Sequence, residues 1–139
     1  MGTMVRDCPN AFLMFGPNLA VSSSAFIIIE AQLDYIVDAL RQARRKRLAT
    51  IEINPGVTAR FNERVQVALR GSVYEGGCSS YFIDKNGRNI TAWPWTTFEM
   101  RRRFRHFNLR DYLVTQQQAA GSGVASSGTH ISGREFSHA

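Results

Sequence analysis

The sequence has no apolar run long enough to cross a membrane and no leader for secretion. Its longest uninterrupted apolar run, residues 25–29, is far shorter than the roughly 20 residues that a membrane-spanning helix needs. Met1 is not followed by the basic stretch and the apolar stretch that mark a secretory signal. These absences predict a chain without membrane association, and a cytoplasmic location is the expectation.

Cysteine and histidine are scarce, which limits metal and disulfide chemistry. Cys8 and Cys78 have no cysteine or histidine at the spacing of a metal site, and the pair makes no disulfide framework. His130 and His138 lie in a Gly- and Ser-rich tail, where a solvated role is expected. We therefore predict no metal site and two reduced cysteines of minor structural importance.

Nucleotide-binding and nucleophile motifs are also absent. No Gly-x-Gly-x-x-Gly follows a predicted strand, so this sequence holds neither the pyrophosphate site for FAD nor the Rossmann site for NADPH. The serines at 22–24 lack a Gly-x-Ser-x-Gly context, which favours helix capping as their role. Glu30, Asp34 and Asp38 have no histidine partner and are expected to form a solvated helix face. No catalytic residue is assigned.

The composition is typical of one globular domain with an excess of positive charge. Of the 139 residues, 44% are hydrophobic and 20% are charged, and the formal net charge is +6. The basic residues gather in two clusters: Arg41, Arg44, Arg45, Lys46 and Arg47, and then Arg101, Arg102, Arg103, Arg105 and Arg110. Such clusters suit a small nucleic-acid-binding module, but cations also favour the negative end of a helix. We expect no nucleic-acid partner, because no recognition motif accompanies the charge.

Hydrophobic patterning predicts an α/β chain in the order strand-helix, strand-helix, β-hairpin, helix. Residues 12–15 are wholly apolar, as in a strand buried on both faces. A helix is predicted from the serines to about Arg47. Its apolar face is expected to consist of Ile29, Leu33, Ile36, Val37 and Leu40.

The second unit begins with residues 50–53, whose alternation predicts a strand. Asn54-Pro55 then matches a capping residue followed by proline at the first helical position, and Gly71 is a natural glycine at the helix end. A β-hairpin over residues 81–93 is predicted from apolar arms on either side of an Asn-Gly turn.

A short helix from Thr96 to Phe104 and a docking segment with Leu109, Tyr112 and Leu113 complete the predicted ordered region. We expect residues 1–115 to form that region. The composition then changes to Gln, Gly, Ser and Ala, which predicts a disordered tail over residues 116–139.

The Gly16-Pro17-Asn18 turn joins the first predicted strand to the first predicted helix. A strand that feeds a helix in this way presents free backbone N–H groups and the positive end of a helix dipole to a ligand. The turn suits an electron-rich edge of a cofactor. An ordinary strand-to-helix connection is the alternative.

Several phrases taken together resemble one family. GTMV, CPNAFLMFGPN and IIIEAQLDYIVDAL occur in this order, and RFNERVQVALRGSVYEGGCSSYFIDKNGRNITAWPWTTFEMRRRF follows. This series is similar to the C-terminal portion of class B flavoprotein monooxygenases, the flavin-containing and Baeyer-Villiger group. That family carries a GFPNLFxLYGPNT phrase, then an I-E-Q-Y helix, and later an N-G-R-N-x-T-x-W-P phrase.

The resemblance implies chemistry that uses FAD and NADPH, in which one oxygen atom of O2 is inserted into a ketone or a soft nitrogen or sulfur nucleophile. It implies that the chain is a partial, C-terminal piece of a Rossmann-like FAD/NAD(P)-binding domain. Gly16, Pro17 and Asn18 would shape a flavin-facing turn. Backbone N–H groups of Val21, Ser22 and Ser23 would face the flavin ring. The segment from Cys78 to Trp95 would lie towards the substrate and the nicotinamide.

The family usually continues G-P-N-T-x-L-G-H-N-S, whereas this chain has GPNLAVSSSA. The rest of the family pattern is missing upstream, which predicts a fragment that neither binds FAD tightly nor turns over alone. Without the preceding domain, its apolar strand and helix face should leave an exposed hydrophobic patch. Pairing with the missing upstream domain, or a regulatory or decoy role beside a full-length homologue, are the remaining alternatives.

Overall fold

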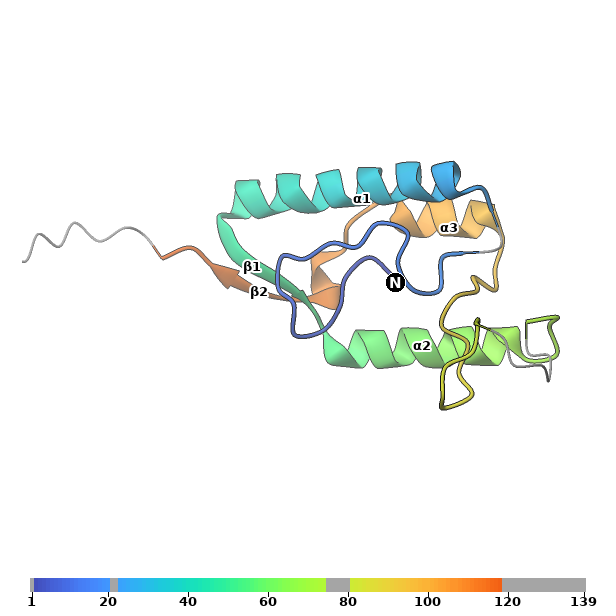
Figure 1. Ribbon diagram of the computed structural model, residues 1–139. Helices are drawn as coiled ribbons and strands as arrows, with labels where there is room; N and C mark the ends of the chain where they lie inside the picture. Colours follow the sequence, from blue (N-terminus) through green and yellow to red (C-terminus); the bar gives the residue numbers. More distant parts are fainter. Residues whose placement is uncertain (1, 21–22, 75–80, 119–139) are drawn as a thin grey trace, which may run out of the picture.

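The computed structural model describes residues 2–20, 23–74 and 81–118. Its elements follow the order α1 (Ala25–Lys46), β1 (Leu48–Ile53), α2 (Pro55–Leu69), α3 (Thr97–Phe104), a 3-10 helix η1 (Leu109–Asp111) and β2 (Tyr112–Gln116). Helices α1 and α2 lie on opposite sides of the N-terminal segment, and the sheet lies at one end (Figure 1). The chain is therefore of the α/β class, and none of the described helices is long and apolar enough to cross a membrane.

Helix α1 confirms the predicted long helix, and its ends follow the expected signals. Ser24 is the N-cap residue, and Arg47 ends the helix in a left-handed conformation with φ 52°. Arg44, Arg45 and Lys46 occupy the last turn, where cations interact favourably with the helix dipole.

The predicted buried face of α1 is wrong. The residues that the helix buries are Ile28, Ala31, Gln32, Tyr35 and Ala39. Leu33, Val37 and Leu40 of the predicted face are exposed instead. Both sets recur at helical spacing, so periodicity could not separate them. Ala31 and Ala39 lie on the buried side, and their small side chains let other segments pack closely against the helix.

Strand β1 confirms the predicted strand and extends it to six residues. It pairs antiparallel with β2, with Ile51 opposite Val114 and Ile53 opposite Tyr112. Strand β2 was predicted only as part of a docking segment, and the structure leaves four of its five residues exposed.

Asn10 covers the other edge of β1. Its backbone N–H donates to the carbonyl oxygen of Ile51 at 2.9 Å, and its Oδ1 accepts from the Ile51 N–H at 2.9 Å. Its Nδ2 also donates to the carbonyl oxygen of Ala49 at 3.0 Å. One residue therefore satisfies an edge that a third strand would otherwise occupy.

The strand predicted at residues 12–15 is absent, and this prediction is wrong. Leu13, Met14 and Phe15 are each about 40% exposed, and Phe15 has a left-handed φ of 51°. A strand buried on both faces needs neighbouring strands, and the described residues provide none beside this run. The sheet formed by β1 and β2 is two-stranded and antiparallel, so the Rossmann-like detail of the predicted fold is not confirmed by the described residues.

Gln32 holds this irregular run against α1. Its Oε1 accepts from the Phe15 N–H at 2.7 Å, and its Nε2 donates to the Leu13 carbonyl and the Thr3 hydroxyl, both at 3.1 Å. The Gln32 side chain is fully buried, so its amide must be paired within the protein.

The predicted β-hairpin is correct in its turn but wrong in its arms. Asp84 and Arg88 close the turn, and Gly87 adopts the left-handed φ of 73° that favours glycine. A single antiparallel bridge joins Ile83 to Asn89. The second arm instead lies beside Ala20, which forms a parallel bridge with Ala92.

The remaining helices begin as predicted. The Asn54 side chain accepts from the Gly56 N–H with Pro55 at the first position, and the Thr96 side chain accepts from the Glu99 N–H. Helix α2 ends at Leu69, two residues before Gly71, which has φ 71°. Strand β2 continues through Gln116, and the predicted tail beyond residue 118 lies outside the described residues.

An aromatic cluster ties α1 to the C-terminal elements. The Tyr35 ring meets Phe104 edge-on at 5.3 Å, and the Phe107 ring stacks on Tyr112 at 4.3 Å. The hydroxyl oxygens of Tyr35 and Tyr112 are 2.6 Å apart. Burial raises the pKa of Tyr35 above its usual value, and it raises the pKa of Tyr112 to about 12.

We expect the substitution Gln32→Leu to lower the free energy of unfolding by about 1–3 kcal/mol, since it leaves the Phe15 N–H and the Leu13 carbonyl without their partner. Urea titration followed by circular dichroism measures this loss. The same change at Gln118, which is exposed, serves as the control and should shift stability by less than about 0.5 kcal/mol. Equal effects of the two substitutions would contradict the role given to Gln32.

The tyrosine pair predicts a loss of stability at high pH. Because the folded state keeps both phenols protonated beyond the usual pKa of 10.0, their contribution is complete below pH 10 and is lost as the pH rises towards 12. Comparing urea titrations at pH 9 and at pH 12 should show that the protein loses at least about 2 kcal/mol more than the Tyr35→Phe/Tyr112→Phe variant, since Tyr112 alone accounts for about that much. The control Tyr81→Phe removes an exposed phenol and should leave the difference unchanged.

Candidate functional site

The Gly16-Pro17-Asn18 turn is built on a close crossing of two backbone segments. A Cβ atom placed on Gly16 would lie 1.9 Å from the carbonyl oxygen of Gly2. A Cβ atom placed on Gly2 would lie 1.9 Å from the carbonyl oxygen of Pro17. Only glycine fits at either position, so the turn and the N-terminal segment fix each other.

Asn18 anchors the turn to residues 89–92. The buried Asn18 side chain donates from Nδ2 to the carbonyl oxygens of Asn89 at 3.0 Å and Ala92 at 3.3 Å. Its backbone N–H donates to the Ile90 carbonyl at 3.0 Å, and its φ of 56° is left-handed. Asparagine tolerates that conformation better than most residues, so both its backbone and its amide serve the turn.

Asn89 holds the opposite side of this contact. Its Oδ1 accepts from the N–H groups of Thr91 at 3.1 Å and Ala92 at 2.8 Å, and its backbone N–H donates to Gln66 Oε1 at 3.0 Å. Its Nδ2 donates to the Tyr74 carbonyl at 3.3 Å. The side chain is buried, so the Asn-x-Thr pattern at this position serves the chain's own hydrogen bonding.

The start of α1 has no side-chain compensation among the described residues. Ser24 makes no capping hydrogen bond, and the first turn contains no acidic residue. Its first N–H groups and the positive end of the helix dipole therefore face no anionic side chain there. Of the predicted flavin-facing residues, Ser23 is half-buried just before this start, and Val21 and Ser22 lie outside the described residues.

A cavity of about 560 Å3 lies beside the turn. Pro17 and Asn18 line it, whereas Gly16 and Ser23 do not. The rest of the lining comes from the N-terminal segment, α2 and the loop before residue 89, namely Gly2, Met4, Val5, Arg6, Leu13, Pro55, Thr58, Ala59, Phe61, Asn62, Glu63 and Arg88. Its walls combine apolar residues with Arg6, Arg88 and Glu63, and Glu63 lies 3.8 Å from the Arg88 guanidinium.

A larger cavity of about 680 Å3 lies between α1 and α3, away from the predicted turn. Asp38 on its wall accepts hydrogen bonds from the Phe107 N–H at 2.8 Å and from Gln42 Nε2 at 3.1 Å. The prediction that Asp38 is merely solvated is therefore wrong, because this carboxylate fixes the segment after α3. Within the described residues, no group of three potential ligands could hold a metal ion.

The segment before α3 forms an aromatic and arginine stack. The Arg103 guanidinium lies 4.5 Å from the centre of the Trp95 ring, and Arg64 approaches the same ring at 5.8 Å. Hydrogen bonds from Arg102 and Arg103 lower the pKa of Glu99 to about 2. Two cations of the second basic cluster, Arg102 and Arg103, are thus paired within the fold.

Three residues important for this site received no role from the sequence: Gly2, Gln32 and Asn89. Each occurs inside a phrase that resembles the family, in GTMV, in the I-E-Q-Y helix and in the N-G-R-N-x-T phrase. The resemblance was therefore the signal that could have singled them out. Their contacts depend on chain segments far apart in sequence.

Comparison with known proteins gives the family. The chain is 37% identical over 126 residues to a Baeyer-Villiger monooxygenase of Streptomyces coelicolor, a match that covers 88% of this chain and 24% of that protein. It is also 37% identical over 128 residues to a Baeyer-Villiger monooxygenase of Pseudomonas aeruginosa, with coverage of 89% and 24%. The resemblance to the flavin monooxygenase family is confirmed. No protein-family model matches the chain.

More distant comparisons agree with this relationship. An FAD-binding monooxygenase of Aspergillus niger is 28% identical over 130 residues, covering 89% of this chain and 21% of that protein. The fold is similar to that of an oxidized steroid monooxygenase bound to NADP, with a TM-score of 0.73 and 17% identity over 84% of this chain and 23% of that one. The chain thus spans about a quarter of the length of the Baeyer-Villiger monooxygenases it matches. These relatives do not favour the nucleic-acid-binding alternative.

The close crossing at Gly16 predicts that Gly16→Ala destabilises the chain by at least about 1–3 kcal/mol, because the new methyl group meets backbone on the facing segment. Thermal and urea unfolding measure the effect. Gly56→Ala is the matched control, since its Cβ would approach only side-chain atoms at 3.3 Å and 3.6 Å, and alanine favours a helix. A neutral Gly16→Ala variant would show that the two segments do not touch as described.

Proposed function

We propose that this chain is a C-terminal portion of a monooxygenase that depends on FAD and NADPH, and that it supplies one wall of the cofactor site. The observation that carries this proposal is the 37% identity to two Baeyer-Villiger monooxygenases over nearly 90% of the chain. The relatives are about four times longer, so the complete activity would need the regions that this chain does not match.

The turn and the start of α1 are the parts of this chain that fit a flavin. When bound, a reduced flavin would supply the chemistry by which one oxygen atom of O2 enters a ketone or a soft nitrogen or sulfur nucleophile. The uncompensated N–H groups at the start of α1 would favour negative charge on the flavin ring.

The roles of the predicted residues differ within this proposal. Asn18 would hold the turn in shape without donating to the flavin from Nδ2, because that group already donates to the carbonyl oxygens of Asn89 and Ala92. Pro17 would form part of the wall of the adjoining cavity, and Gly16 would permit the crossing with Gly2. Val21, Ser22 and Ser23 would contribute backbone N–H groups. Tight FAD binding by this chain alone is not expected, since the sequence has no pyrophosphate motif.

A chimera tests the proposal. In the Streptomyces coelicolor enzyme, the segment that aligns with this chain is replaced by the whole chain, and a second protein has a flexible linker of equal length there. We expect the first protein to retain FAD and to oxidise NADPH faster when a ketone, a sulfide or an amine is added, and the linker protein to do neither.

Two results would contradict parts of this proposal. A chimera that retains FAD but gives no substrate-dependent NADPH oxidation with any of the three compound classes would contradict the assigned function. Stoichiometric FAD and NADPH oxidation by the isolated chain would show that the chain is sufficient and not a portion of the catalytic unit.

A further inference from the structure

Helix α1 is apolar on two sides but is covered on only one of them. Opposite the buried face lies a row that we call the α1 stripe, which consists of Phe26, Leu33, Val37 and Leu40. Their side chains are 80%, 49%, 40% and 55% exposed. At 100° per residue these positions share one side of the helix. A helix with apolar residues on both sides is normally covered on both.

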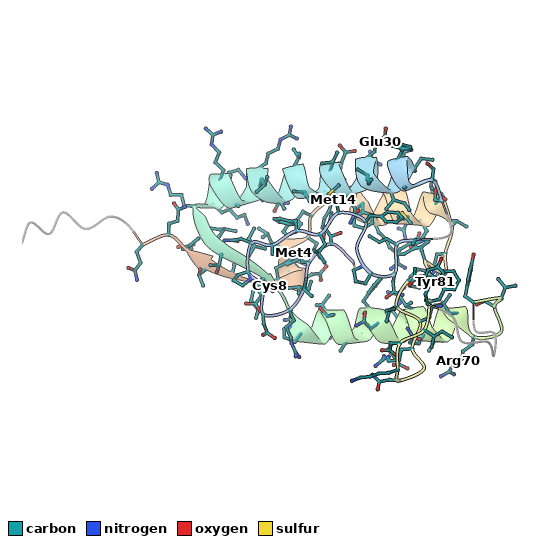
Figure 2. All side chains as sticks on the ribbon, in the orientation of Figure 1. Met4, Cys8, Met14, Glu30, Arg70 and Tyr81 are labelled. Atoms are coloured by element: carbon teal, nitrogen blue, oxygen red, sulfur yellow. The ribbon has the colours of Figure 1, made fainter. Side chains whose placement is uncertain are left out.

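The N-terminal segment adds a second exposed apolar run beside α1. The hydrogen bonds from Gln32 to Phe15 and Leu13 place residues 13–15 along the side of α1 that buries Gln32. Figure 2 shows Met14 close beside α1, with Glu30 pointing away from the rest of the molecule. Leu13, Met14 and Phe15 are about 40% exposed, so the fold exposes two apolar runs, the stripe and this one.

The same run has unused backbone donors. In the part of the chain that the structure describes, the N–H groups of Phe12 and Met14 donate no hydrogen bond. Exposed apolar side chains together with free backbone N–H groups fit a polypeptide partner, which can offer both apolar contacts and carbonyl acceptors.

The charge of the chain distinguishes between two possible partners, a second copy of this chain and a different polypeptide. Glu30 borders the first part of the stripe, and the stripe continues towards Arg41 and Arg44; none of the three forms an ion pair among the described residues. A second copy of this chain would bring together two molecules that each carry a net charge of +6, which opposes self-association. A partner with an apolar face that presents carboxylates to the Arg41 and Arg44 end is the better match.

We infer that the α1 stripe and residues 13–15 dock onto the part of a flavin monooxygenase fold that this chain does not match, whether that part is in the same polypeptide or in another. The inference rests on the proposed function. The same fold occupies 23% of the steroid monooxygenase chain, so most of such an enzyme remains to cover this face.

Cysteine labelling tests the docking without requiring turnover. In a C8S/C78S background, Leu33→Cys places a thiol on the α1 stripe, and Arg45→Cys places one on the same helix away from the stripe. Each variant is labelled with a maleimide in the isolated full chain and in the chimera with the Streptomyces coelicolor enzyme. We expect the L33C thiol to react at least ten times more slowly in the chimera, and the R45C thiol to react at similar rates in both.

The outcomes separate docking from function. Equal labelling of the L33C thiol in the chimera and in the isolated chain overturns the inference, even if the chimera is active. Protection of that thiol in an inactive chimera supports docking while the proposed function fails. A dimeric mass of the isolated chain in sedimentation, with the L33C thiol already protected, assigns the surface to a second copy and also overturns the inference.

The separate-polypeptide case has its own measurement. The whole chain is co-expressed with the Streptomyces coelicolor enzyme from which the aligned segment is deleted, and the complex is isolated through a tag on the chain. A 1:1 complex that is weakened at least ten-fold by Leu33→Gln/Leu40→Gln, but not by Arg45→Gln, supports docking in trans. A complex that is equally strong with all three proteins contradicts the role of the α1 stripe.

Discussion

The structure depends on the pairing of irregular backbone with carboxamide side chains. Residues 2–20 form no strand ladder that would satisfy their N–H and C=O groups, which must still find partners when the chain packs. Asn10 completes the edge of β1, Gln32 binds the run at 13–15, and Asn18 meets Asn89 across the turn. These amides turn a segment without regular structure into the layer that lies between α1 and α2 (Figure 1).

The hydrogen bonds between Gln32 and residues 13–15 determine which side of α1 faces inwards. Because Gln32 must reach Phe15 and Leu13, the helix is turned so that Ile28, Tyr35 and the small alanines are buried with it. Leu33 and Leu40 then point outwards, although their spacing is as regular as that of the buried set. Exposed apolar side chains therefore lie on the helix side that periodicity assigned to the core.

The polar groups of the turn beside the 560 Å3 cavity are likewise used for hydrogen bonds within the fold. Asn18 already uses its amide and its backbone N–H for contacts to residues 89–92, so the turn offers a ligand mainly shape and backbone. The cations are constrained in a similar way, since Glu99 pairs with Arg102 and Arg103 and the Arg103 guanidinium also packs on Trp95. A basic composition therefore does not by itself make a nucleic-acid surface.

The sequence alone determined the local features. Two helix starts are marked in this way, one by Asn54 with Pro55 and one by Thr96. The Asn54 and Thr96 side chains accept hydrogen bonds from the first helical turn, and the Pro55 ring fixes the first helical position, so each signal acts locally. The ordered family phrases also identified the relationship that the comparisons bear out. Only the tertiary structure decided the buried face of α1, the pairing of β2 with β1 and the loss of the strand at 12–15. Each of these depends on a partner distant in the sequence, and residues 12–15, although apolar enough for a buried strand, have no neighbouring strand among the described residues to pair with.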